Sequence, residues 1–168
     1  MLTGKMLNAL NEQINAELHS AYLYLSMSTW LEEQGLSGFA NWMRVQYEEE
    51  TAHAMKILHY TQERGGRVLL TPIAAVDQNF DSLLAVFEKT LAHEQHVTSL
   101  INNLVDIAIE ERDHATRSFL QWFVDEQVEE EATAGDILND LRLLNGESHG
   151  VFTLNREFAS RKSTPDEE

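Results

Sequence analysis

Four long stretches of this chain repeat their apolar residues with a helical period, and one of the three connections between them is far longer than the others. Only two prolines and eight glycines occur in 168 residues, so helices can run far without interruption. Apolar residues recur about every 3.6 positions, which predicts helices over roughly 3–34, 37–64, 82–110 and 113–145.

The long connection, residues 67–81, contains a proline and shows no helical period. A helix of about 28 residues spans roughly 42 Å, and about 15 extended residues reach roughly 50 Å. This connection can therefore cross the whole length of a bundle and let the second and third helices run parallel. The sequence thus predicts an all-α fold, a four-helix bundle with one long crossover.

Helix-end signals support these boundaries. Gly35 is a predicted C′ glycine, Ser37 and Asp113 are predicted N-caps of the second and fourth helices, and Asn145-Gly146 is a predicted helix end. A short amphipathic helix is expected over about 148–160. The polar tail, 161–168, is expected to be frayed, and we expect residues 1–168 to form a single domain, with the bundle over about 3–145.

Composition excludes several classes of function. The net charge of −16 argues against nucleic-acid binding. The chain has no cysteine, which excludes disulfides, cysteine metal sites and iron–sulfur clusters and fits a reducing cytoplasm. The first residues do not resemble a signal peptide, and no stretch approaches the roughly 20 apolar residues that span a bilayer. We therefore expect a cytoplasmic protein that does not associate with membranes.

Each of the four apolar stripes is interrupted by polar residues near the middle of its helix. In a bundle of helices of similar length, these positions should meet at one height. Burying a carboxylate is costly without a compensating charge, and neither lysine nor arginine occurs in the stripes. A bound metal ion is the simplest compensation. The interrupting residues that could bind it are Glu17 on the first helix, Glu50 and His53 on the second, Glu94 on the third, and Gln127 and Glu130 on the fourth.

Glu50 and His53 form a Glu-x-x-His pair, in which a spacing of three residues places both side chains on one helical face. Oxygen ligands with one imidazole suit iron(II), manganese or another hard-to-borderline divalent ion, and suit copper(I) or structural zinc poorly. The alternative is that the helical phase is off by one position and some of these glutamates face solvent.

Over nearly its whole length the chain resembles the non-haem bacterial ferritins of the ferritin-like di-iron family. The resemblance rests on four long helices, the crossover and the short fifth helix, and on sequence motifs. These motifs are Glu17 with Tyr24, Glu49-Glu50-Thr-Ala-His53, His93-Glu94-Gln95, and Phe119-Leu-Gln-Trp-Phe followed by Glu126-Gln127-Val-Glu129-Glu130.

The resemblance implies a role for each of these positions. Glu17, Glu50 and His53 would hold one iron, and Glu50 would bridge to a second iron. Glu94 and Glu130 would complete the second site, with Gln127 hydrogen-bonding on the dioxygen side and Tyr24 beside the centre as an electron donor. The residues that match a third iron site of some family members are Glu49, Glu126 and Glu129, together with Glu130.

The implied activity is a ferroxidase that oxidises iron(II) with dioxygen or hydrogen peroxide. The implied assembly is a hollow homo-oligomeric shell of 24 subunits that stores iron as a ferric oxyhydroxide mineral. Haem-binding relatives carry methionine directly after the second-helix glutamate, where this chain has Thr51, so we expect no haem in that mode. Gln127-x-x-Glu130 replaces the second Glu-x-x-His of di-iron oxygenases, which favours iron storage.

Two other functions stay open at this stage, a small di-metal oxygenase on the same bundle and a non-catalytic helical scaffold. Several residues also have simpler explanations. Tyr24 could be core filling whose hydroxyl reaches a carboxylate, and Glu49, Glu126 and Glu129 could form a solvated acidic face. Glu48 and Glu131 are expected to be solvated, and the histidines other than His53 to be surface or partly packed residues.

Overall fold

The computed structural model describes residue 2 and residues 4–163, and this part of the chain is built from helices without any β-strand. The predicted all-α class is confirmed. Within these residues, no helix combines the length and the hydropathy that crossing a bilayer would need. The helices are α1 (Gly4–Glu33), α2 (Ser37–Glu63), α3 (Leu83–Glu110), α4 (His114–Leu144) and α5 (Ser148–Phe158).

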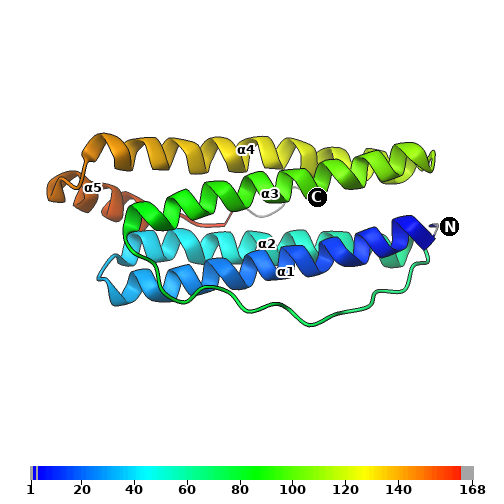
Figure 1. Ribbon diagram of the computed structural model, residues 1–168, viewed down its shortest axis with the longest axis horizontal. Coiled ribbons are helices and arrows are strands. Elements are labelled where there is room, and N and C mark those ends of the chain that lie inside the picture. The colour runs from blue at the N-terminus through cyan, green and yellow to red at the C-terminus, as the bar shows by residue number, and fades with distance from the viewer. Residues whose placement is uncertain (1, 3, 164–168) are drawn as a thin grey trace.

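The four long helices form two antiparallel hairpins, α1 with α2 and α3 with α4 (Figure 1). The crossover between Glu63 and Leu83 runs the length of the bundle beside α1, so α2 and α3 are parallel as predicted. Side chains of α1 hold the crossover backbone. Asn11 Oδ1 accepts from Leu69 N at 2.7 Å, and Ser26 Oγ donates to Asp77 O at 2.6 Å.

Most of the predicted helix ends are confirmed. Gly35, with a φ of 74°, follows α1, and Asn145, with a φ of 46°, ends α4 in the left-handed region. Asp113 caps α4 by accepting from Thr116 N, and Ser82 caps α3 by accepting from Ala85 N at 3.1 Å.

The prediction that Ser37 caps α2 is wrong. Ser37 is the first helical residue, and the N-cap position falls on Leu36, whose carbonyl already accepts from Ala40 N at 2.9 Å. The N–H groups at the start of α2 that have no partner within the helix are instead satisfied from α5. Asn155 Oδ1 accepts from Gly38 N at 2.9 Å and from Phe39 N at 3.2 Å.

The C-terminal helix α5 packs against α2 at one end of the bundle. The ring of Phe158 lies 5.1 Å from that of Phe39 in an edge-on contact, and Val151 and Leu154 pack against the same apolar cluster. A Cβ atom at Gly38 would lie 1.6 Å from Asn155 O, so only glycine permits this close approach.

Two apolar clusters fill the ends of the bundle. One contains Phe39, Met43 and Phe87, and the other contains Leu10 and Ile101, among further residues of all four long helices. The buried glutamates belong to neither cluster. Mid-helix polar residues therefore separate two apolar cores, as the interrupted stripes predict.

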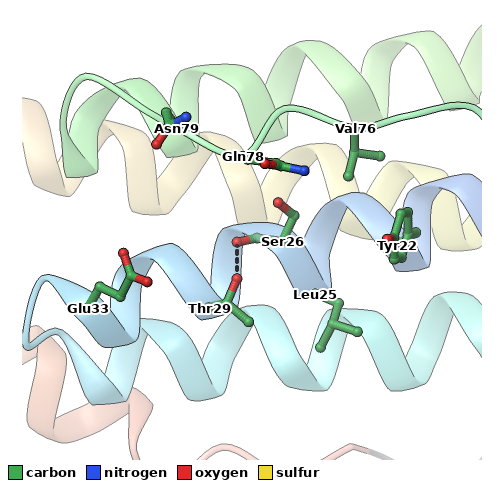
Figure 2. A pocket seen from close by; sticks show the side chains of 8 residues that line it. All are labelled: Tyr22, Leu25, Ser26, Thr29, Glu33, Val76, Gln78 and Asn79. Atoms are coloured by element: carbon green, nitrogen blue, oxygen red, sulfur yellow. Dashed lines mark hydrogen bonds between the residues drawn. The ribbon is translucent and has the colours of Figure 1, made fainter.

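A surface cavity of about 450 Å³ lies between α1 and the crossover (Figure 2). Thr29 Oγ1 donates to Ser26 O at 2.8 Å on the α1 side, and the crossover contributes Val76, Gln78 and Asn79. None of the residues lining this cavity belongs to the polar centre of the bundle. The chemistry suggested by the sequence therefore lies in a packed interior and not in the open cavity.

Candidate metal centre

Polar side chains from all four long helices converge between the two apolar clusters. Each is at most 7% exposed, so the alternative in which these glutamates face solvent does not describe this structure. The converging residues are Glu17 and Tyr24 from α1, Gln46, Glu50 and His53 from α2, Glu94 from α3, and Gln127 and Glu130 from α4.

The α1–α2 half of this centre presents three potential ligand atoms to one point. One ligand atom each from Glu17, Glu50 and His53 lies within 4.8 Å of the others, and no other such trio occurs in the part of the chain that the structure describes. Glu17 Oε2 and Glu50 Oε2 are buried without a hydrogen-bond partner, although Gln13 Nε2 donates to Glu17 Oε1 at 2.7 Å. Buried carboxylate oxygens without partners are costly, and a divalent cation would satisfy both.

Aromatic rings hold the imidazole of this trio. The ring of His53 lies 5.3 Å from that of Trp122 and 6.0 Å from that of Phe123, edge-on in both cases. His53 Nδ1 stands 3.6 Å from Glu50 Oε2, beyond a good hydrogen bond but compatible with a shared cation between them. Trp122 therefore helps to fix a candidate ligand.

In the α3–α4 half of the centre, the carboxylates accept hydrogen bonds from buried side chains. The hydroxyl of Tyr24 donates to Glu94 Oε1, and Gln127 Nε2 donates to Glu94 Oε2 at 3.2 Å. Gln46 Nε2 donates to Glu130 Oε2 at 2.9 Å. Glu94 and Glu130 therefore lie in the centre but outside the three-residue group, each already served by a buried donor.

Burial and mutual repulsion change the proton affinity of these carboxylates. Burial, followed by the charge of Glu17, raises the pKa of Glu50 well above its ordinary value. Burial raises the pKa of Glu94 to about 7 against the opposing effect of its hydrogen bonds from Tyr24 and Gln127. Burial and the charge of Glu94 raise the pKa of Glu130 to about 8. Without metal, the centre therefore retains protons near neutral pH.

The phenol of Tyr24 is fully buried beside these carboxylates. Burial, and then the charge of Glu94, raises the pKa of Tyr24 well above its ordinary value. The hydroxyl therefore stays protonated and serves as a hydrogen-bond donor. The edge of its ring also contacts His93, at 5.8 Å between ring centroids.

The three outer carboxylates are less buried. Glu49 is half-buried and its Oε2 accepts from Arg161 Nη2 at 2.7 Å, while Glu126 is half-buried and Glu129 is exposed. These three do not bring ligand atoms together as Glu17, Glu50 and His53 do. Glu48 is exposed as expected.

Two expectations about surface residues are wrong. Glu131 is half-buried and accepts from Thr98 Oγ1 at 2.6 Å, because α3 and α4 pack closely there. The tail is not frayed at Arg161, whose guanidinium donates to Trp42 O and Gln46 Oε1 as well as to Glu49. Residues 164–168 of that tail lie outside the described residues.

Sequence reasoning missed three hydrogen-bond donors that hold residues of the centre or its rim, Gln13, Gln46 and Arg161. Gln46 lies in the polar interruption of α2 and could have been found as an amide near a carboxylate. Arg161 lies 115 positions away from Gln46, so no local pattern connects the two.

Comparisons with a family model and with known proteins all point to the ferritins. The model of the ferritin-like domain matches residues 7–144. A bacterial non-heme ferritin of Bacteroides fragilis is 44% identical over 161 residues, which cover 96% of this chain and all of that protein. One of Campylobacter jejuni is 42% identical over 152 residues, 90% of this chain and 91% of that one.

Solved structures agree. An open pore ferritin of the archaeon Archaeoglobus fulgidus superposes with a TM-score of 0.95 and 49% identity, covering 96% of this chain and all of that one. The expected resemblance is therefore confirmed across the bundle, the crossover and the fifth helix, and this chain belongs to the ferritin-like family.

Proposed function

We propose that this protein takes up iron(II), oxidises it in the centre of the bundle, and stores the product as a ferric oxyhydroxide mineral inside a homo-oligomeric shell. The observation that carries the proposal is the buried group of Glu17, Glu50 and His53, with two carboxylate oxygens that lack any hydrogen-bond partner. Membership of the ferritin-like family supports the same reading.

In this proposal, iron is the substrate and the centre holds two ions at once. Glu17, Glu50 and His53 bind the first iron(II). Glu50 also reaches the second, which Glu94 and Glu130 complete from the opposite hairpin. Because a carboxylate binds metal in its deprotonated form, the protons that Glu50, Glu94 and Glu130 retain must leave as iron enters.

Two iron(II) ions supply the two electrons that one dioxygen needs. Each iron gives one electron, and dioxygen takes up two protons and leaves as hydrogen peroxide. With hydrogen peroxide as oxidant, two electrons and two protons instead yield two waters. Carboxylates stabilise the harder iron(III) product better than imidazole does, which suits a site rich in glutamate.

The remaining site residues receive supporting roles. Gln127 fixes Glu94 by donating from its amide nitrogen to Glu94 Oε2, and its amide oxygen would serve as a ligand of the second iron. Tyr24 donates to the other oxygen of Glu94 and is the candidate electron donor. Glu49, Glu126 and Glu129 would draw together around an outer iron beside Glu130 as that ion binds.

We further propose a 24-subunit shell of single-domain chains working in the cytoplasm, with iron(II) and an oxidant as small-molecule partners and with no nucleic-acid, membrane or haem partner. Thr51, whose hydroxyl donates to Tyr47 O at 2.7 Å, stands where haem-binding relatives supply a methionine.

Gel filtration after aerobic iron loading tests the proposal. The full-length protein receives iron(II) in air, and the column is monitored for protein and for iron absorbance together. We expect both to elute in one peak of the size of a large shell. A small iron-free species would contradict storage. A small species that consumes dioxygen would indicate a di-metal oxygenase, and no oxidation at all would indicate a scaffold.

A further inference from the structure

The C-terminal segment that follows α5 returns to the metal centre and places a cation against it. Arg161 Nη2 donates to Glu49 Oε2 at 2.7 Å and to Gln46 Oε1 at 2.6 Å, and Arg161 Nη1 donates to Trp42 O at 3.2 Å. The guanidinium also stacks over the ring of Trp42, with its carbon 4.5 Å from the ring centroid. Four interactions thus fix this side chain on α2.

The same contacts extend inward to a carboxylate of the centre. Gln46 accepts from Arg161 through Oε1, so its amide nitrogen faces the other way and donates to Glu130 Oε2 at 2.9 Å. A glutamine has one acceptor and one donor end, and Arg161 therefore decides which end Glu130 meets. The side chains of Arg161 and Glu49 are only 24% and 15% exposed, so water screens their attraction poorly.

The segment is anchored independently of its charge. Asn41 Nδ2 donates to Phe158 O and to Arg161 O, both at 3.0 Å, and Asn155 caps the start of α2. The guanidinium can therefore leave Glu49 without α5 detaching from α2, although the turn at Arg161 then loses the side-chain contacts that hold it.

We propose that Arg161 is a tethered cation that occupies the outer iron site and competes with iron(II) for Glu49. The inference rests on the proposed function, because it assigns Glu49 to a site that iron fills. When iron(II) binds Glu49, the guanidinium is displaced. When the outer iron moves on, Arg161 returns and neutralises the carboxylate again. The outer site is thereby kept weak enough to release its ion.

Competition is reciprocal, so each partner must weaken the other by the same factor. Removing Arg161 should tighten the outer site, and filling the outer site should loosen the C-terminal segment. If Arg161 only fastened α5 to the bundle, its removal would lower stability without tightening metal binding, and iron would not loosen the segment.

The first measurement is anaerobic calorimetric titration of the assembled, full-length protein with iron(II). In Arg161→Gln, the outermost equivalent of iron should bind tighter than in wild type by about 5-fold or more, the lower end of typical coupling between sites. Lys162→Gln is the matched control, because it removes an exposed cation from the next position. Unchanged or weaker outer binding in Arg161→Gln overturns the proposal, as does the absence of an outer equivalent in both proteins.

The second measurement is hydrogen exchange of the segment with anaerobic iron(II). The amide of Arg161 donates to Phe158 O at 3.2 Å and reports on the turn. Its protection should fall when the outer equivalent is added to wild type, and should be low from the start and insensitive to iron in Glu49→Gln. Constant protection in wild type at full outer occupancy overturns displacement.

The two proposals can fail separately. If two iron equivalents bind and oxidise rapidly in both wild type and Arg161→Gln while the outer affinity is unchanged, only the tethered cation is wrong. If wild type neither binds nor oxidises iron at Glu17, Glu50 and His53, the proposed function itself fails.

Discussion

The two hairpins bring unequal halves to the polar centre. The α1–α2 half holds an imidazole and two carboxylates, each with an oxygen that has no hydrogen-bond partner. The α3–α4 half holds Glu94 and Glu130, both served by buried donors. The α1–α2 half has buried oxygens that a cation would satisfy, whereas the carboxylates of the α3–α4 half already accept hydrogen bonds from the protein.

This difference explains how such a centre can exist before metal arrives. Donors from Tyr24, Gln127 and Gln46 satisfy oxygens of Glu94 and Glu130, and burial raises the pKa of both carboxyls so that protons neutralise part of their charge near neutral pH. The cost of burying unpaired oxygens then falls mainly on Glu17 and Glu50. Iron should therefore enter the α1–α2 half first and displace the proton of Glu50, and the other half should follow as Glu94 and Glu130 lose theirs.

The largest effect should come from breaking the α1–α2 half. Glu50→Ala and His53→Ala should each slow rapid iron(II) oxidation by at least about 100-fold, since groups that merely support metal ligands already contribute about 10–100-fold. The helical fold and the shell should persist. Stopped-flow absorbance after rapid mixing with oxygenated buffer measures the rate, and Glu48→Ala, at an exposed neighbouring position, is the control. Wild-type rates in either variant would remove the pair from the site.

The α3–α4 half should also reveal itself in the pH dependence of stability. A carboxylate whose pKa is raised on folding binds more protons in the folded state, so stability falls as pH rises. The window runs from the unfolded value of about 4.3 to the folded values of about 7 for Glu94 and about 8 for Glu130. The metal-free protein should therefore be more stable at pH 5 than at pH 8.

Glu94→Gln should flatten this pH dependence. The substitution removes the charge but keeps an acceptor for Tyr24, whereas leucine would leave that buried hydroxyl unpaired. A tenfold change in proton affinity is worth about 1.4 kcal/mol, so the recovery at pH 8 is on the order of 3 kcal/mol. Calorimetric melting of metal-free protein across pH 5–8 measures it. A wild-type protein whose melting temperature ignores pH in this window would contradict the repulsion in the centre.

Much of this arrangement could be predicted from helical periodicity. Glu17, Glu50, Glu94 and Glu130 interrupt their stripes at mid-helix, and the length of the connection allowed a crossover that lets α2 and α3 run parallel. These are local and additive properties, so a sequence displays them. Lysine and arginine are absent from the stripes, and the charges that act most on Glu50 in the structure are those of other glutamates, Glu17, Glu94 and Glu130.

Helical periodicity could not predict the contacts made by residues outside the four long helices, or those that depend on side-chain orientation. Asn155 replaced the expected cap at Ser37 only because α5 folds back onto α2. Arg161 reaches Glu49 for the same reason. The hydrogen bonds that Tyr24 and Gln127 donate to Glu94 depend on side-chain rotamers on three helices, and spacing along one helix does not encode these rotamers.

The outer carboxylates belong to neither half and should show a smaller effect. Glu126→Ala should lower the number of iron(II) ions bound per subunit before mineral forms, while the first fast oxidation phase survives. The reason is that Glu126 and Glu129 stand one turn apart on α4 beside Glu130. Anaerobic calorimetric titration counts the ions, with Glu147→Ala as an exposed control. An unchanged number of bound ions would mean that these residues form a solvated acidic face and not an iron site.

The smallest effect should come from the hydroxyl of Tyr24, which donates from α1 to Glu94 in the α3–α4 half of the centre. Tyr24→Phe removes the hydroxyl that donates to Glu94 Oε1 and leaves the amide of Gln127 as the donor on the other oxygen. A lost hydrogen bond of about 1 kcal/mol corresponds to about fivefold in a rate constant, so oxidation should slow by no more than that. The hydroxyl also lowers the pKa of Glu94, so without it this carboxyl should hold its proton to higher pH and the pH dependence of stability should steepen. Stopped-flow rates and melting curves of Tyr24→Phe measure both consequences in one protein. If oxidation instead fell as far as in His53→Ala while the melting curves stayed unchanged, Tyr24 would take part in electron transfer, and the division between a metal-ready half and a hydrogen-bonded half would not describe the chemistry.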